Sequence, residues 1–201
     1  MIELDDPRLS LCVVTDDLRD GTSGLVHRAL AAERGGATMV LLRLKHAHAL
    51  ELVEAGRSLV SALRIPVVVS ERLDVALSCG AAGVHLGAGS MPVVALRSHV
   101  PVGFLIGASV SDAAALVQAA LADYVTIGPV LSSGSASMAL ATFASLAVSC
   151  ARPVLAIGGI DAASVPALRA AGASGIAVIG AVFGAPDPEV AAATLAAAFF
   201  A

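Results

Sequence analysis

Short apolar runs recur along the chain, and each is followed by a longer segment in which apolar residues return every three or four positions. The runs are rich in β-branched residues, which predicts strands. They span residues 11–15, 38–43, 65–70, 83–86, 104–107, 124–127, 153–157 and 175–179. Helices are expected over residues 25–34, 49–63, 111–121, 139–150, 162–171 and 188–199, with further short helices after Arg72 and after Met91.

The expected strands are almost continuously apolar, which is typical of parallel strands buried on both faces. Eight strand–helix units in one chain predict an α/β fold, a single-domain (β/α)8 TIM barrel over residues 1–201. The alternative is an open doubly wound sheet. However, the first strand is not followed by the G-x-G-x-x-G sequence of dinucleotide-binding sheets.

Composition narrows the function classes. The chain is 57% hydrophobic, 14% charged and 3% aromatic, with a net charge of −4. This profile excludes disorder, and without Lys/Arg clusters or stacking aromatics no nucleic-acid partner is expected. The longest charge-free stretch, residues 124–151, contains Gly128, Pro129 and several serines, so no membrane span is expected.

The cellular context follows from the N-terminus and the cysteines. The first residues are acidic and lack the pattern of a signal peptide. Cys12, Cys79 and Cys150 are widely spaced and form neither a zinc motif nor a disulfide framework. A cytoplasmic protein is therefore expected, and a homodimer would cover apolar helix surface.

In a barrel of this kind the chemistry lies where strands end, and glycines follow the last two strands. Gly158 and Gly159 follow the seventh strand, and Ile179-Gly180 ends the eighth. Their backbone N–H groups predict a phosphate site. The alternative is that Gly158-Gly159 only makes a tight turn.

Cations and a carboxylate gather at the ends of the second and third strands. Arg43 and Lys45 have strand spacing, so both point the same way if the strand continues that far, and with Arg72 they could hold a second anion. The alternative is that they are solvated loop cations. Glu71 is the candidate ligand for Mg²⁺, as one carboxylate supplemented by substrate phosphates. His85, at the end of the fourth strand, is either a satisfied core histidine or a proton-transfer residue.

The ordered motifs resemble those of the thiamine phosphate synthase/TenI superfamily. The resemblance spans nearly the whole chain and rests on motifs in the family's order and spacing. They are Val13-Val14-Thr15-Asp16, Arg43-x-Lys45, Arg72-Leu73-Asp74-Val75-Ala76, Gly83-Val84-His85-Leu86-Gly87, Ile106-Gly107-x-Ser109, Asp123-Tyr124-Val125-x-x-Gly128-Pro129-Val130, Ala156-Ile157-Gly158-Gly159-Ile160 and Gly175-Ile176-Ala177-Val178.

The resemblance implies a small phosphorylated heterocycle as partner. Synthases of this family join hydroxymethylpyrimidine diphosphate to a thiazole phosphate and release diphosphate with Mg²⁺. By resemblance, Gly159 and the Ile179-Gly180 turn would bind the thiazole phosphate, and Arg43 and Lys45 the diphosphate. Ser109 would lie near the pyrimidine or the diphosphate. The catalytic candidates are His85, Arg43, Lys45 and Ser109.

The sequence departs from the synthase pattern on the metal–diphosphate side. Leu41 replaces a glutamine, Glu71 replaces one metal aspartate and Ser90 replaces the other. The Thr-x-Thr-Lys loop retains hydroxyls at Ser133 and Ser135 but loses its lysine to alanine. The Mg²⁺ site implied by the family is therefore incomplete.

The first interpretation is therefore a TenI-like protein that binds a thiazole phosphate, as a thiazole tautomerase or a pathway accessory. Against a tautomerase, Pro129 stands where that enzyme has its catalytic histidine; His85 would have to substitute for it. The alternatives are an active thiamine phosphate synthase and a non-catalytic phosphate-binding regulator. Whether the loop at residues 132–139 acts as a lid is left open.

Overall fold

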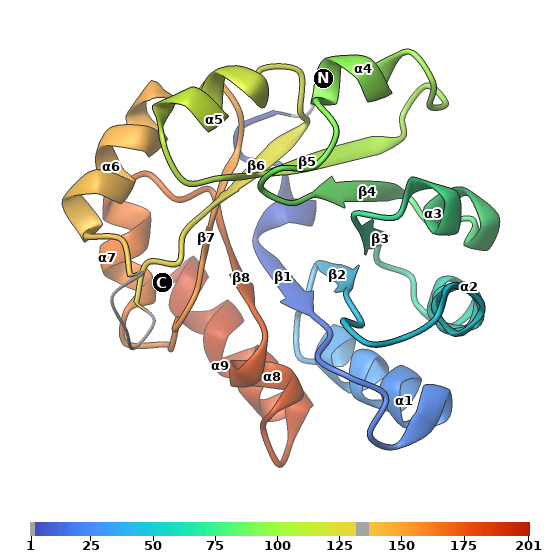
Figure 1. Cartoon of the computed structure of the whole chain (residues 1–201). Coiled ribbons are helices and arrows are strands. Elements are labelled where there is room, and N and C mark those ends of the chain that lie inside the picture. Colours follow the sequence, from blue (N-terminus) through green and yellow to red (C-terminus); the bar gives the residue numbers. More distant parts are fainter. Residues whose placement is uncertain (1–2, 132–136) are drawn as a thin grey trace.

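Eight parallel strands close into a barrel in the computed structural model, which describes residues 3–131 and 137–201 (Figure 1). Each strand pairs with the next, and β1 pairs with β8 to close the sheet. The strands are β1 (Leu11–Val14), β2 (Met39–Leu42), β3 (Val67–Ser70), β4 (Gly83–Leu86), β5 (Leu105–Val110), β6 (Tyr124–Ile127), β7 (Val154–Ile157) and β8 (Gly175–Val178). The expected (β/α)8 barrel is confirmed.

Helices surround the barrel on its outside (Figure 1). They are α1 (Gly21–Arg34), α2 (Ala49–Ala62), α3 (Leu73–Cys79), α4 (Val93–Arg97), α5 (Ala113–Gln118), α6 (Leu140–Ser149), α7 (Val165–Ala170), α8 (Gly180–Phe183) and α9 (Pro188–Phe200), with a 3₁₀ turn at Pro7–Leu9. The last helix packs against the first, where Arg34 Nε donates to Glu189 Oε2 at 2.8 Å. No helix in the described ranges is long and apolar enough to cross a membrane.

The strands bury side chains on both faces, which explains their continuous apolar character. Outward-facing residues such as Val40 and Val69 belong to one cluster shared with the helices. Inward-facing residues, including Met39, Val68 and Leu155, form a second cluster that fills the barrel. Every residue of β1, β2, β4, β6 and β8 is buried.

Two elements differ from the sequence-based expectation in ways that bear on the site. Strand β5 continues to Val110 because residues 108–110 pair with β6, which places Ser109 inside the strand opposite Thr126. Helix α8 was not expected, because four residues carry no periodic pattern. It places the start of a helix directly after β8.

Gly107 makes room inside the barrel for an aromatic contact between two other strands. A Cβ atom at this position would overlap the rings of Tyr124 and His85, and would lie 2.5 Å from the Tyr124 hydroxyl. The two rings are stacked with centroids 5.5 Å apart. The sheet register sets Gly107 between them, opposite His85 on one side and Tyr124 on the other.

We expect Gly107→Ala to lower the free energy of unfolding by about 1–3 kcal/mol, because an extra methyl group in a filled interior forces its neighbours to move. Urea denaturation measures the change. Gly180→Ala is the matched control, because the Cβ atom added there meets no heavy atom within 4 Å. Equal stability of the two variants would contradict the overlap at Gly107.

Candidate active site

A cavity of about 650 Å³ opens at the carboxyl ends of the strands. In TIM barrels this end carries the chemistry. The cavity is lined by Val14, Leu41, Arg43, Lys45, Ser70, Glu71, His85, Gly87, Ala88, Ser109, Thr126, Gly128, Pro129, Ile157, Gly158 and Ile179. The structure therefore brings together Arg43, Lys45, Glu71, His85, Ser109, Gly158 and Ile179 of the predicted site residues.

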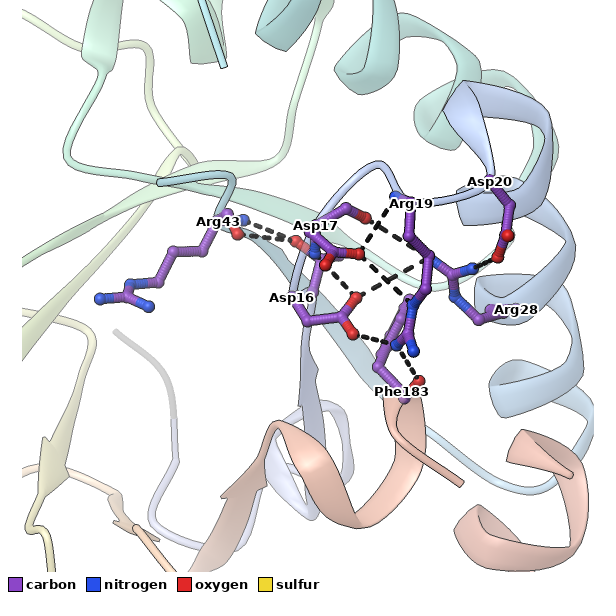
Figure 2. A network of polar contacts seen from close by, with 8 residues as sticks. Asp16, Asp17, Arg19, Asp20, Arg28, Arg43 and Phe183 are labelled. Carbon is purple, nitrogen blue, oxygen red and sulfur yellow. Dashed lines mark hydrogen bonds and ion pairs between the residues drawn. The ribbon is translucent and has the colours of Figure 1, made fainter. Parts of the chain in front are cut away.

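Arg43 follows β2, and its backbone is fixed by the neighbouring strand. The Thr15 hydroxyl accepts from Arg43 N at 2.8 Å and donates to Arg43 O at 3.2 Å. Thr15 is buried, so this link is protected from water. The guanidinium extends away from the acidic residues of the β1–α1 segment (Figure 2).

Those acidic residues are occupied by two other arginines. Asp16 pairs with Arg19, and Asp20 pairs with Arg28 (Figure 2). Arg19 also donates to the Phe183 carbonyl at 2.8 Å, which ties the β1–α1 segment to the end of α8. The acidic residues after β1 are thus members of an ion-pair network.

Arg43 and Lys45 remain available to a ligand. Among residues 3–131 and 137–201, no carboxylate lies within ion-pair distance of either side chain. Two uncompensated cations that line one cavity attract an anion of high charge, such as a diphosphate.

Arg72 does not join these two cations. Its Nη2 lies 2.5 Å from Asp74 Oδ2, and it is not among the described residues that line the cavity. The paired guanidinium lowers the pKa of the Asp74 carboxyl to about 2. The sequence could not distinguish this local pair from a ligand contact, because both need the same exposed arginine.

Glu71 is the one carboxylate among the described residues that line the cavity. Its φ is 63°, a conformation that residues other than glycine rarely adopt, and its N–H donates to His85 O at 2.8 Å. The side chain lies against Gly87, where an added Cβ atom would collide with Oε1. No group of three His, Cys, Asp or Glu residues that could hold a metal occurs in the described ranges.

His85 lines the cavity and is buried, with both ring nitrogens in hydrogen-bond contact. Nδ1 lies 3.2 Å from the Tyr124 hydroxyl, and Nε2 lies 3.1 Å from Ser109 Oγ and 3.3 Å from Thr126 Oγ1. Burial lowers the pKa of His85 to about 4, so the imidazole is neutral at pH 7. Tyr124 and Thr126 were not predicted as site residues, although their alternate positions in the sixth strand put both on one face.

The glycines at the ends of β7 and β8 adopt conformations that suit a backbone anion site. Gly158 and Gly159 have φ values of 102° and 69°. Gly158 and Ile179 line the cavity, and each is followed directly by one of the other predicted phosphate residues, Gly159 and Gly180. Within the described ranges, the N–H groups of Gly159 and Gly180 have no backbone acceptor.

Some residues that the sequence singles out lie elsewhere or outside the described part of the chain. Ser133 and Ser135 lie outside the described residues, as does most of the loop at 132–139, for which a role as a lid was left open. Ser90 lines a neighbouring cavity of about 250 Å³, which shares Gly87, Ala88 and Ser109 with the main one.

Comparison with known proteins connects this site to a family. Residues 11–182 match the family model described as "Thiamine monophosphate synthase". The thiamine-phosphate synthase of Methanoculleus marisnigri is 43% identical over 197 residues, covering 92% of each chain. The thiamine-phosphate synthase of Azorhizobium caulinodans is 38% identical, covering 93% of each chain.

The comparison with solved structures agrees with the comparison of sequences. The thiamine phosphate pyrophosphorylase from Pyrococcus furiosus superposes with a TM-score of 0.87 at 34% identity, covering 96% of each chain. A 3-hexulose-6-phosphate synthase superposes at 0.71 with 20% identity, which shows the shared fold alone. These names favour the synthase alternative of the sequence analysis over the TenI-like interpretation. By the match of the family model and of these relatives, the chain belongs to the thiamine monophosphate synthase (TMP-TENI) family.

Proposed function

We propose that the chain is a thiamine phosphate synthase, which joins hydroxymethylpyrimidine diphosphate to a thiazole phosphate and releases diphosphate. The observation that carries the proposal is the charge distribution around the cavity. Arg43 and Lys45, which have no ion-pair partner among the described residues, line the cavity after β2, and the glycine-rich strand ends line it at Gly158 and Ile179. Two anion sites in one cavity fit a reaction between two phosphorylated substrates.

The reaction requires positive charge near the departing diphosphate. The bond from the pyrimidine methylene carbon to the diphosphate oxygen breaks, and its electron pair leaves with the diphosphate. The thiazole nitrogen supplies the electron pair of the new carbon–nitrogen bond. Arg43 and Lys45 would stabilise the charge that develops on the departing oxygen, and prearranged cations are effective where charge appears in a transition state.

The residues present fit a divalent metal that is held partly by the substrate. Mg²⁺ is commonly bound by one or two carboxylates together with substrate phosphates. Glu71 faces the cavity that contains Arg43 and Lys45 and would provide the protein ligand. When bound, the metal would supply further charge neutralisation on the diphosphate.

The relatives support a synthase, whereas the tautomerase interpretation has less support from the site. A tautomerase acting through His85 would need this side chain to exchange protons with a ligand. Both ring nitrogens already have protein partners, and burial lowers the pKa of the imidazole to about 4. A group of that pKa is a weak proton acceptor at neutral pH.

The test is turnover of the purified chain with both synthase substrates and Mg²⁺, monitored as diphosphate release and as thiamine phosphate formed. We expect equal amounts of the two products and none when either substrate is omitted. Glu71→Gln should raise the Mg²⁺ concentration needed for half-maximal rate about tenfold or more, because a charged ligand is lost. Glu54→Gln, on the exposed face of α2, is the matched control.

Two results would contradict the proposal. One is the absence of diphosphate release at saturating substrates and Mg²⁺. The other is isomerisation of a thiazole carboxylate phosphate by the same preparation without any synthase turnover, which would restore the TenI-like interpretation.

A further inference from the structure

Four side chains from three strands form a hydrogen-bonded polar group at the inner end of the cavity. His85 comes from β4, Ser109 from β5, and Tyr124 and Thr126 from β6. Tyr124 is 1% exposed and His85 5% exposed, and Ser109, His85 and Thr126 line the cavity floor. Polar groups at such depth require hydrogen bonds, so the direction of each bond can be worked out.

Tyr124 fixes which partner donates in the first of these hydrogen bonds. Within residues 3–131 and 137–201 its hydroxyl has one hydrogen-bond partner, His85 Nδ1 at 3.2 Å. Burial raises the pKa of Tyr124 well above 10, so the phenol retains its proton. A buried hydroxyl hydrogen without an acceptor is strongly unfavourable, so the phenol donates and Nδ1 accepts.

The tautomer of His85 follows from that bond. A ring nitrogen that accepts a hydrogen bond bears no hydrogen, so when Nδ1 accepts from Tyr124 the imidazole hydrogen is on Nε2. Nε2–H therefore donates toward Ser109 Oγ at 3.1 Å or Thr126 Oγ1 at 3.3 Å. Thr126 Oγ1 in turn donates to Ser109 Oγ at 3.3 Å.

Both routes end on the same atom. Whether His85 donates directly or through Thr126, the Ser109 oxygen accepts a hydrogen bond from below. Among the described residues the Ser109 hydrogen then has no acceptor, and the side chain lines the cavity that contains Arg43 and Lys45. The Ser109 oxygen accepts a hydrogen bond from the protein, so its hydroxyl can donate one. Such a hydrogen bond is strongest when the acceptor is an anion.

We propose that Tyr124, His85 and Thr126 act as a positioning relay that holds Ser109 as a hydrogen-bond donor toward a phosphate oxygen of the bound substrate. This inference rests on the proposed function for its ligand, whereas the hydrogen bonds that carry it are between side chains of the protein. His85 is then a positioning residue that carries no proton to or from the substrate. Gly107 is required because only a residue without a side chain leaves room for the Tyr124–His85 contact.

The first test needs no substrate. A two-bond ¹H–¹⁵N correlation spectrum of the ¹⁵N-labelled protein at pH 7.5 identifies which imidazole nitrogen bears hydrogen. For His85 we expect a protonated Nε2 and an unprotonated Nδ1, with Nδ1–H becoming populated in Tyr124→Phe. The signals are assigned by their loss in His85→Gln. A protonated Nδ1 in the unmodified protein would overturn the relay whether or not the chain is a synthase.

The second test is a double-mutant cycle on kcat. Ser109→Ala should lower kcat about tenfold to a hundredfold, because a hydrogen bond to a charged oxygen is lost. Tyr124→Phe, which does not reach the cavity, should lower kcat about threefold to tenfold with little change in KM. In the Ser109→Ala background, Tyr124→Phe should have no further effect, because both changes remove the same interaction.

A purely structural role for Tyr124 gives a different pattern. It would lower kcat by the same factor in both backgrounds, and that additivity would overturn the proposal. Thermal unfolding of each variant confirms that the compared proteins are folded at the assay temperature. If the unmodified protein does not turn over, the synthase proposal fails while the spectrum still decides the relay.

Discussion

Replacing Arg43 by alanine is expected to lower kcat for diphosphate release by a factor of about 10²–10³, the effect of removing one well-placed donor from a developing negative charge. Arg43 lines the cavity and, within the described ranges, has no ion-pair partner. Its backbone is held by Thr15, so truncation of the side chain should leave β2 in place. Steady-state kinetics with both substrates at saturation measures the loss.

Two variants control this experiment. Arg64→Ala removes an exposed arginine of the α2–β3 segment and should leave kcat unchanged. Arg43→Lys retains the charge without the planar pair of donors, so it should recover only part of the rate. If Arg43→Ala retained more than a third of the rate, the guanidinium would not be a diphosphate ligand.

Valine at position 159 is expected to weaken binding of the thiazole phosphate about tenfold to a hundredfold, which corresponds to roughly 1–3 kcal/mol. The φ of Gly159 is 69°, where a β-branched residue is strained, and a side chain would also keep a phosphate from the backbone N–H groups. Isothermal titration of the thiazole phosphate into each protein measures the change.

Backbone strain alone has to be separated from loss of the binding site. Gly103→Val introduces the same kind of strain, at a φ of 86°, in the segment before β5, where the Cβ atom meets no heavy atom within 4 Å. It should lower the free energy of unfolding without changing the binding constant. Equal affinities of the Gly159→Val and unmodified proteins would refute the phosphate site at the end of β7.

The barrel could be predicted from the sequence because its strands are buried on both faces, and short continuous apolar runs such as Tyr124–Ile127 are typical of such strands. Arg43 and Lys45 likewise line one cavity, although β2 ends at Leu42 and the strand spacing from which this was predicted does not extend over them. Such features depend on local pattern and on the rule that strand ends meet at one end of the barrel.

The contacts that orient the site could not be predicted in the same way. Tyr124 is 39 residues from His85 along the chain, and only the register of β4, β5 and β6 brings the two rings together across Gly107. For Arg72, a contact nearby in the sequence accounts for the difference from the prediction. Its motif resembles a ligand contact, but Asp74, two residues away, competes for the same guanidinium.

Glu71 has a consequence for protein engineering. It is the one residue other than glycine with a positive φ in the described part of the chain. An L-residue in that conformation costs about 1–2 kcal/mol, which glycine would largely avoid. A directed-evolution library screened for heat resistance alone would therefore enrich glycine or asparagine at position 71, and the most robust variants would lack the cavity's carboxylate.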